Sequence, residues 1–175
     1  KGPCRAGCSG GVHAGGPADV VRNICLVGAE VSWSRPGASL MKVWGQRLGG
    51  AVRFDGVGGR TMRQEGVSSW FPIEELSRIG REAIAKRLPA NLRRIRQTAD
   101  AVTDASADIL VIIDSPDFTH RVARRVRARN PAIPIIDYVS PSVWAWRPGR
   151  ARAMSAYVDH VLALLPFEPA EYRRL

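Results

Sequence analysis

Residues 109–118 read ILVIIDSPDF, and this stretch decides the fold of the chain. A continuous apolar run without alternation, here residues 109–113, is typical of a strand that is covered on both faces in a parallel sheet. Two carboxylates, Asp114 and Asp117, follow the run directly. The stretch therefore predicts a buried strand that ends where α/β proteins hold their ligands.

Further apolar runs and one amphipathic stretch surround this strand. Short apolar runs lie at residues 24–27, 51–54, 135–139 and 161–165, and the last is continuous like residues 109–113 and likewise predicts a strand covered on both faces. Between residues 84 and 102 apolar side chains recur every three or four positions, as on one face of a helix, and Pro89 predicts a break or kink there. Phe118, Val122 and Val126 mark a further helix. Strands that alternate with helices predict a doubly wound α/β domain of about five parallel strands.

Composition limits the class of protein. The chain has 175 residues with a net charge of +10, and 45% of the residues are hydrophobic, enough for one folded core. The excess of positive charge favours polyanionic partners such as nucleic acid, anionic lipid or phosphorylated substrates. No run reaches the length of a membrane-spanning helix. Three cysteines do not make a disulfide scaffold, which favours a reducing, cytoplasmic location.

Residues 1–22 differ from the rest of the chain, because they are rich in glycine and have no apolar periodicity. We interpret them as a flexible leader, followed by one domain over residues 23–175. Cys4, Cys8 and His13 have the spacing of metal ligands, but no fourth ligand accompanies them, so we predict no metal site.

The segments after the predicted strands carry the candidate chemistry. Residues 56–60 read GVGGR, which lacks the last glycine of a dinucleotide fingerprint and indicates a turn. No P-loop, zinc-protease or serine-hydrolase motif occurs. Asp117 is either the N-cap of the helix that begins at Phe118 or a general base whose pKa is raised by burial or by its neighbour. The aromatic residues of 138–147 either pack in the core or form platforms for sugar rings or acyl chains.

Several segments resemble lipid-A-disaccharide synthase. These are IDSPDF (residues 113–118), DYVSPSVWAWR (137–147), LALLPFEPAEY (162–172), VGGRTM (57–62) and FPIEELS (71–77). The resemblance extends from residue 24 to residue 175, and the aromatic-rich VSPSVWAWR is its most specific part.

This resemblance implies the N-terminal, Rossmann-like half of an inverting GT-B glycosyltransferase. Such enzymes transfer 2,3-diacylglucosamine from UDP to 2,3-diacylglucosamine 1-phosphate, forming the β-1,6-linked lipid A disaccharide and UDP without a metal or other cofactor. They work as peripheral proteins at the cytoplasmic face of the inner membrane of Gram-negative bacteria, and a homo-oligomer is one possible state of the full-length family. Because the family is about twice as long as this chain, the C-terminal donor domain is expected to be missing, and the chain alone is expected not to turn over substrate.

The resemblance also assigns roles to residues. Asp117 matches the general base that deprotonates the 6-hydroxyl of the acceptor, with Asp114 beside it, and Asp108 is expected to be structural. The other expected substrate contacts are Glu30, Ser32, Tyr138, Ser140, Ser142 and Trp146.

Two positions depart from the family motif A-G-E-x-S-G-D after the first strand. Trp33 replaces its glycine and Ser34 its aspartate. A tryptophan does not readily take the positive φ of a tight turn and could fill the acceptor pocket. One alternative is therefore an inactive remnant that only binds acylated glucosamine phosphate or a membrane.

Charge suggests two further partners. Residues 70–96 interleave apolar and basic side chains, which favours contact with an anionic bilayer over a purely structural amphipathic helix once acylated substrates are considered. A basic α/β nucleic-acid-binding module is the less favoured alternative, since no nucleic-acid-binding motif accompanies the arginines of residues 121–129.

Overall fold

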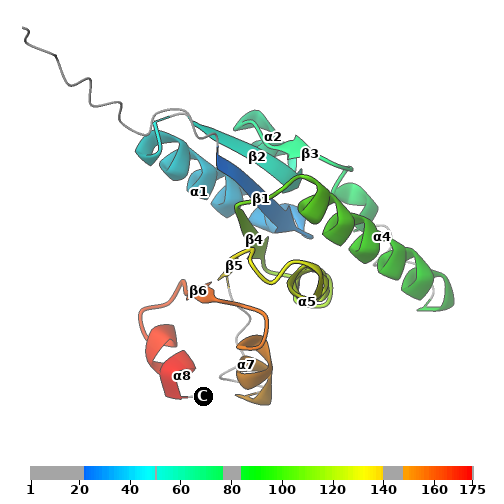
Figure 1. The fold of residues 1–175 in the computed structure, drawn as a ribbon, viewed down its shortest axis with the longest axis vertical. Helices are drawn as coiled ribbons and strands as arrows, with labels where there is room; N and C mark the ends of the chain where they lie inside the picture. Colours follow the sequence, from blue (N-terminus) through cyan, green and yellow to red (C-terminus); the bar gives the residue numbers. More distant parts are fainter. Residues whose placement is uncertain (1–21, 50, 77–83, 140–147, 175) are drawn as a thin grey trace, which may run out of the picture.

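The fold is built on one parallel sheet. A computed structural model describes residues 22–49, 51–76, 84–139 and 148–174. Its six strands lie in the order β3-β2-β1-β4-β5-β6, and every neighbouring pair is parallel (Figure 1). The strands are β1 (Arg22–Gly28), β2 (Val52–Val57), β3 (Ser68–Ser69), β4 (Ile109–Ile113), β5 (Ile135–Tyr138) and β6 (His160–Leu162).

Helices connect the strands and cover both faces of the sheet. They are the 3₁₀ turn η1 (Val31–Trp33), α1 (Ser34–Arg47), α2 (Arg60–Gln64), α4 (Ile84–Asp104), α5 (Thr119–Arg129), α7 (Pro148–Met154) and α8 (Glu168–Arg174). Side chains of α4 and α5 form one buried core with the sheet, and side chains of α1 and α2 form a second core on the other face. This arrangement is Rossmann-like and confirms the predicted doubly wound α/β fold.

The uninterrupted apolar sequence of β4 follows from this two-sided burial. Leu110 and Ile112 belong to the core beneath α4 and α5, whereas Val111 and Ile113 belong to the core beneath α1 and α2. Successive strand residues point to opposite faces, so a strand that is covered on both faces needs apolar side chains at every position.

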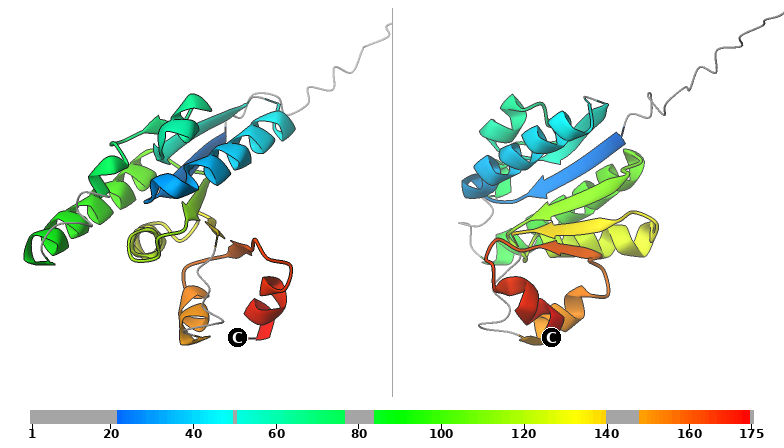
Figure 2. Two further views of the ribbon diagram at one scale, coloured as in Figure 1. Left: turned by 180° about the vertical axis from the view of Figure 1, so that it is seen from behind. Right: turned by 90° about the vertical axis from the view of Figure 1, so that its left-hand side faces the viewer.

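The direction in which successive strands are added to the sheet reverses between β1 and β4. Connections from β1 lead toward β2 on one side, while β4 and β5 extend the sheet in the other direction, as the blue, green, yellow and orange strands of Figure 2 show. The loops after β1 and β4 therefore diverge at this point of the carboxyl edge, the position at which open α/β sheets bind ligands; we call this position the β1–β4 crevice.

The sheet differs from the sequence prediction at its two edges. The two-residue strand β3 was not predicted, because its serines carry no apolar pattern. The run at residues 161–165 was predicted to be a strand covered on both faces, and this was wrong: β6 ends at Leu162, and Leu164 and Leu165 are exposed. An edge strand has a neighbour on one side only, so an apolar sequence alone does not ensure its burial.

Two further expectations about local structure were wrong in part: α4 has no break at Pro89, and the turn predicted over residues 56–60 is confined to Gly58 and Gly59, between β2 and α2. Pro89 lies inside α4, which runs as one helix over residues 84–104. A proline near the start of a long helix removes a single backbone hydrogen bond, and the fully buried Ile95, Ala99 and Val102 fix the rest against the sheet. Gly56 lies inside β2 rather than in a turn, at φ +146°, and a Cβ there would lie 1.9 Å from the carbonyl oxygen of Leu26.

The segment predicted to touch a bilayer is partly core. Phe71 and Ile73 are buried, and Trp70 and Leu76 pack against the core beneath α4 and α5, so these four side chains are not membrane anchors in this structure. Leu88 is exposed on α4. Within the part of the chain that the structure describes, no helix combines the length and the apolar character needed to span a membrane.

Candidate functional site

Two carboxylates meet in the crevice between β1 and β4. Gly28, the last residue of β1, pairs with Ile113, the last residue of β4. Glu30 and Asp114 follow these strand ends, and the negative charge of Glu30 acts on the Asp114 carboxyl group. Ser32, in η1, donates a hydrogen bond of 3.3 Å from its hydroxyl to Oε2 of Glu30. The structure thus brings together three residues that the sequence predicted for the site.

Asp114 has the electrostatic environment of a functional carboxylate. Burial of the carboxyl group, which is the largest effect, and the negative charge of Glu30 raise its pKa. Hydrogen-bond donation from the Ser115 backbone N–H and from the Trp33 side chain lowers the pKa, but the net change is an increase. Desolvation and a like charge are the usual means by which enzymes tune an acid or a base. The like charge comes from Glu30, whereas the sequence prediction paired Asp114 with Asp117.

The backbone at this edge of the sheet is strained. Asp114 and Ser115 have φ values of +48° and +50°, and Val139, just after β5, has φ +63°. Positive φ is rare for residues other than glycine and is most unfavourable for a β-branched side chain such as valine. Such strain concentrates at ligand sites, because the surrounding structure must hold it in place.

Thr119 holds the strained turn, and sequence reasoning did not identify it. Its hydroxyl donates to the carbonyl oxygens of Asp114 at 2.5 Å and of Ser115 at 3.1 Å. The side chain is fully buried at the first position of α5. A hydroxyl amino acid in the first turn of a helix that follows an aspartate-rich loop was the available signal, since such residues commonly bond to nearby backbone groups.

Asp117 is exposed on the same turn. The N-cap position of α5 is occupied by Phe118, without a side-chain cap, so the interpretation of Asp117 as the N-cap was wrong. Asp117 forms no hydrogen bond with the residues that the structure describes, which leaves its carboxylate accessible to a ligand.

The two departures from the family motif are accommodated by local packing. Trp33 has φ −87°, so the predicted strain at this tryptophan was wrong. Its side chain packs against the core beneath α1 and α2 and also reaches Asp114. Ser34 is buried, and its hydroxyl oxygen accepts a hydrogen bond of 2.6 Å from Thr61. A Cβ on Gly59 would lie 2.5 Å from Ser34 Oγ, so the glycine of the GVGG segment serves close packing.

The remaining predicted residues are divided between described and undescribed parts of the chain. Tyr138 is half-buried against the core beneath α1 and α2, and its carbonyl oxygen accepts a 3.3 Å hydrogen bond from the Asp114 N–H. Ser140, Ser142 and Trp146, like Cys4, Cys8 and His13, lie outside the described residues. Asp108 has the expected structural contact, since its carboxylate accepts a 2.8 Å hydrogen bond from the Asn23 N–H at the start of the sheet.

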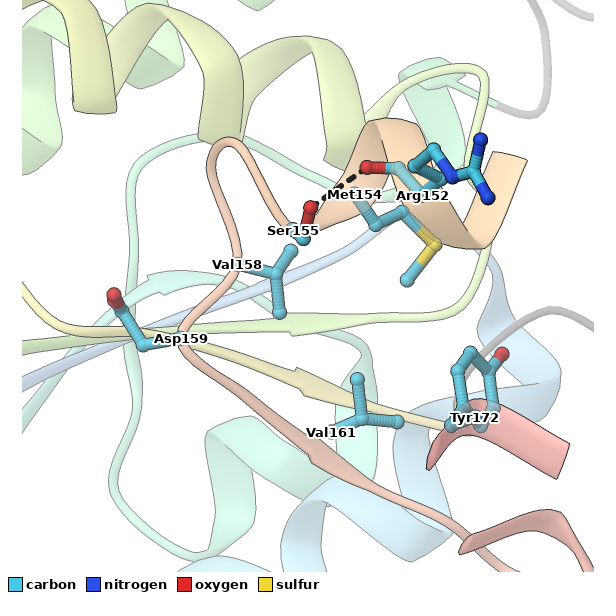
Figure 3. Close-up of a pocket in the computed structure, with 7 residues that line it drawn as sticks. All are labelled: Arg152, Met154, Ser155, Val158, Asp159, Val161 and Tyr172. Carbon is cyan, nitrogen blue, oxygen red and sulfur yellow. Dashed lines mark hydrogen bonds between the residues drawn. The ribbon is translucent and has the colours of Figure 1, made fainter. Parts of the chain in front are cut away.

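A pocket of about 240 Å³ lies elsewhere, between α7, β6 and α8 (Figure 3). Met154, Val158, Val161 and Tyr172 surround it, with Arg152, Ser155 and Asp159 at its margin. The Asp159 carboxylate accepts hydrogen bonds from the Ile135 N–H, at 2.7 Å, and from Arg127. The Asp159 carboxylate is thus used within the fold, and this pocket lacks the paired carboxylates of the β1–β4 crevice.

The described part of the chain contains no cluster of three or more His, Cys, Asp or Glu side chains arranged to hold a metal ion. The first strand–helix turn carries Glu30 in place of a glycine-rich segment, which does not suit a diphosphate. The crevice is better suited to donate and accept hydrogen bonds with hydroxyl groups.

The sequence matches the family model described as lipid-A-disaccharide synthetase over residues 24–175. The chain belongs to the lipid-A-disaccharide synthase family. The lipid-A-disaccharide synthase of Nitrobacter hamburgensis is 70% identical over 161 residues, which cover 92% of this chain and 41% of that protein. The enzyme of Bradyrhizobium diazoefficiens is 68% identical over 90% of this chain and 40% of its own length. That of Rhodospirillum centenum is 46% identical over 83% of this chain and 36% of its own length.

The chain thus spans about two fifths of the length of the family members that it matches. Among solved structures, an O-ureido-L-serine synthase covers 82% of the chain at 17% identity with a TM-score of 0.31, a likeness that carries no argument.

Proposed function

We propose that this chain is the acceptor-side portion of a lipid-A-disaccharide synthase. In the proposed reaction the enzyme transfers 2,3-diacylglucosamine from UDP to the 6-hydroxyl of 2,3-diacylglucosamine 1-phosphate. The observation that carries the proposal is the group of carboxylates at the carboxyl edge of β1 and β4, in a chain of this family. The acidic turn after β1 supports the acceptor rather than the nucleotide as the ligand of this crevice.

The proposed mechanism is a single displacement with inversion. The carboxylate of Asp117 accepts the proton of the acceptor 6-hydroxyl while that oxygen attacks the anomeric carbon. The bond from the anomeric carbon to the UDP oxygen breaks on the opposite side, and UDP leaves with the electron pair. Asp117 is suited to this role because its side chain is exposed at the site. Glu30 and Asp114 accept hydrogen bonds from acceptor hydroxyls and so orient the attacking oxygen.

Turnover in this proposal needs a donor-side domain of the GT-B type, from the part of the relatives that this chain does not match. Four exposed apolar side chains on and just after the edge strand β6 support a covering partner there. They are Leu162, Leu164, Leu165 and Phe167. The purified chain with both lipid substrates is expected to release no UDP, and steady UDP release would contradict this part of the proposal.

Direct binding tests the acceptor assignment. The chain is titrated with 2,3-diacylglucosamine 1-phosphate in mixed micelles, and saturable binding is expected. Asp117→Ala and Glu30→Gln are expected to weaken binding about 10-fold each, as for charged groups that hydrogen-bond a ligand. Glu65→Gln, an exposed acid beyond α2, is the control. Absence of binding to the folded wild-type chain would contradict the proposal.

A second candidate is a remnant that binds the acceptor without catalysis, favoured by Trp33 and Ser34 in place of the family glycine and aspartate. Trp33→Gly tests whether the indole obstructs acceptor binding, because this substitution removes the whole side chain. Tighter acceptor binding by this variant would indicate a partly blocked site, and unchanged binding would show that the indole lies outside the acceptor path.

Attachment to the inner membrane is part of the proposal. The support is the exposed Leu88 on α4, a helix that also carries the exposed Arg93 and Arg96, since apolar and basic side chains on one element suit an anionic surface. Flotation with vesicles that contain anionic lipid is expected to carry the chain upward, and Leu88→Gln is expected to reduce this. Equal flotation with purely zwitterionic vesicles would contradict the role of charge.

A further inference from the structure

Three polar side chains are buried together beneath the candidate site. His120 on α5, Asp137 on β5 and Tyr157 in the turn after α7 have exposed fractions of 4%, 0% and 5%. They come from three separate parts of the chain, and we call them the His120 cluster. Burial of three polar groups in an apolar core is unfavourable unless they interact with one another, and apolar side chains could fill the same space.

The imidazole of His120 links the other two members. Its Nδ1 lies 2.9 Å from the hydroxyl oxygen of Tyr157, and its Nε2 lies 3.5 Å from Oδ2 of Asp137. The His120 and Tyr157 rings meet edge to face at 79°, and the Arg124 guanidinium carbon lies 4.8 Å from the centre of the Tyr157 ring. One rigid ring therefore contacts a strand through one nitrogen and a turn through the other.

The cluster is adjacent to both elements that carry the site. His120 follows Thr119, which holds the strained turn of Asp114, and it lies one helical turn after Asp117. Asp137 precedes Tyr138, whose carbonyl oxygen accepts the hydrogen bond from the Asp114 N–H. The turn of Asp114 is thus connected to the carboxyl end of β5 by this hydrogen bond and to the start of α5 by the Thr119 hydroxyl, and the imidazole connects α5 with β5 within the cluster.

We propose that His120 is a positioning residue, which fixes the first turn of α5, and with it Asp117, relative to the carboxyl end of β5. Side chains must set this distance, because a helix makes no backbone ladder with a strand. The imidazole does so with only two rotatable bonds, through a hydrogen bond of 2.9 Å at Nδ1 and a contact of 3.5 Å with the Asp137 carboxylate at Nε2. Its role in binding rests on the proposed function, since that proposal assigns Asp117 to the acceptor.

Two substitutions separate the two contacts. In His120→Asn the amide lies near the place of Nδ1, which retains the contact with Tyr157 and removes that with Asp137. In His120→Gln the amide reaches the place of Nε2 and does the opposite. Tyr157→Phe removes only the hydroxyl that contacts His120. It is the milder variant to use if the His120 variants fail to fold. His160→Gln is the matched control, because that histidine is exposed on β6.

The first measurement uses the free protein. Amide chemical shifts of residues 114, 115, 117–119, 138 and 139 are expected to change in His120→Asn and His120→Gln, while residues of β1 and β2 keep their shifts and unfolding by urea remains cooperative. Unchanged shifts at Asp117 in both folded variants would overturn the inference. This outcome does not depend on any ligand.

The second measurement is a double-mutant cycle on binding of 2,3-diacylglucosamine 1-phosphate. Each His120 variant is expected to bind about 10-fold more weakly than the wild type, and this loss is expected to vanish when Asp117 is already alanine. If the His120 variants weaken binding equally with Asp117 and with alanine at position 117, His120 does not act through Asp117. Failure of the wild type to bind would contradict the proposed function instead, and the chemical shifts would still decide the positioning role.

Discussion

The side chain of Trp33 reaches the carboxylate of Asp114 and, as a hydrogen-bond donor, lowers the pKa of that group. Trp33 belongs to η1, after β1, and Asp114 follows β4, so this contact bridges the two loops that diverge at the centre of the sheet. A donor stabilises the charged form of a carboxylate, whereas burial and the Glu30 charge act against it. The tryptophan therefore limits the rise in the Asp114 pKa.

The first prediction concerns this hydrogen bond. Trp33→Phe keeps an aromatic ring but removes the N–H donor, so the pKa of Asp114 is expected to rise further above its ordinary value. Carboxyl ¹³C shifts of Asp114, followed over pH by NMR, measure the change. Trp44→Phe, on α1 against the same core, is the control and is expected to leave the titration unchanged. A lower Asp114 pKa in Trp33→Phe would be incompatible with the contact.

The second prediction concerns pH and stability at Asp114. Because folding raises the pKa of this group, the native state binds the proton more tightly than the unfolded chain. Its stabilising contribution is therefore fully present below the ordinary pKa of about 4 and is lost as pH rises through the raised value. Asp114→Asn stays neutral and is expected to have a larger free energy of unfolding than the wild type at pH 7.

This difference is expected to shrink as pH falls toward 4, and urea unfolding at several pH values measures it. Asp117→Asn removes a charge from the exposed part of the same turn and serves as the control. If the advantage of Asp114→Asn grew toward acid pH instead, the assignment of the raised pKa would be wrong.

The third prediction concerns the buried hydroxyl of Thr119. Thr119→Val has nearly the same shape but leaves the carbonyl oxygen of Asp114 without this donor, which is expected to lower the free energy of unfolding by about 1–3 kcal/mol. Thr119→Ser retains the hydroxyl and is the matched variant, with a smaller loss. Equal losses in the two variants would show that the methyl group, not the hydroxyl, stabilises the turn.

The fourth prediction concerns the thiol of Cys25. Burial and the nearby Asp55 carboxylate raise the pKa of this thiol to about 12, although Arg53 lowers it. At pH 8 the thiolate that attacks disulfide reagents is almost absent, so Cys25 is expected to remain unmodified in the folded chain. Mass spectrometry of peptides after treatment with a thiol reagent tests this, and the urea-unfolded chain is the positive control. Rapid labelling of Cys25 in the folded state would contradict its burial.

The fifth prediction concerns packing of Ser34 against the turn after β2. In Gly59→Ala the new Cβ would lie 2.5 Å from Ser34 Oγ and 2.8 Å from Ser34 Cβ, so a loss of about 1–3 kcal/mol in the free energy of unfolding is expected. Ser34→Gly removes both atoms and is expected to reduce the loss when the two changes are combined. If the losses simply add, the clash lies elsewhere.

The sequence by itself determined the class of fold and the position of the site along the chain. The apolar run of β4 predicted a strand covered on both faces, and the alternation of strands with helices predicted parallel pairing with crossover connections. Since ligands bind beyond the carboxyl ends of such strands, the predicted location of Glu30, Ser32 and Asp114 followed before any coordinates. These features depend on local periodicity and on chain direction, which a sequence records.

Only the tertiary structure decided which residues act on one another. Glu30 and Trp33 follow β1 and act on Asp114, which follows the neighbouring strand β4. His120 on α5 contacts Asp137 on β5 and Tyr157 in the turn after α7. The strand order that creates these encounters depends on how helices pack over the sheet, not on any local pattern. The same holds for the continuous α4 across Pro89 and for the exposed end of β6, because burial at a position is set by neighbours that are distant in the sequence.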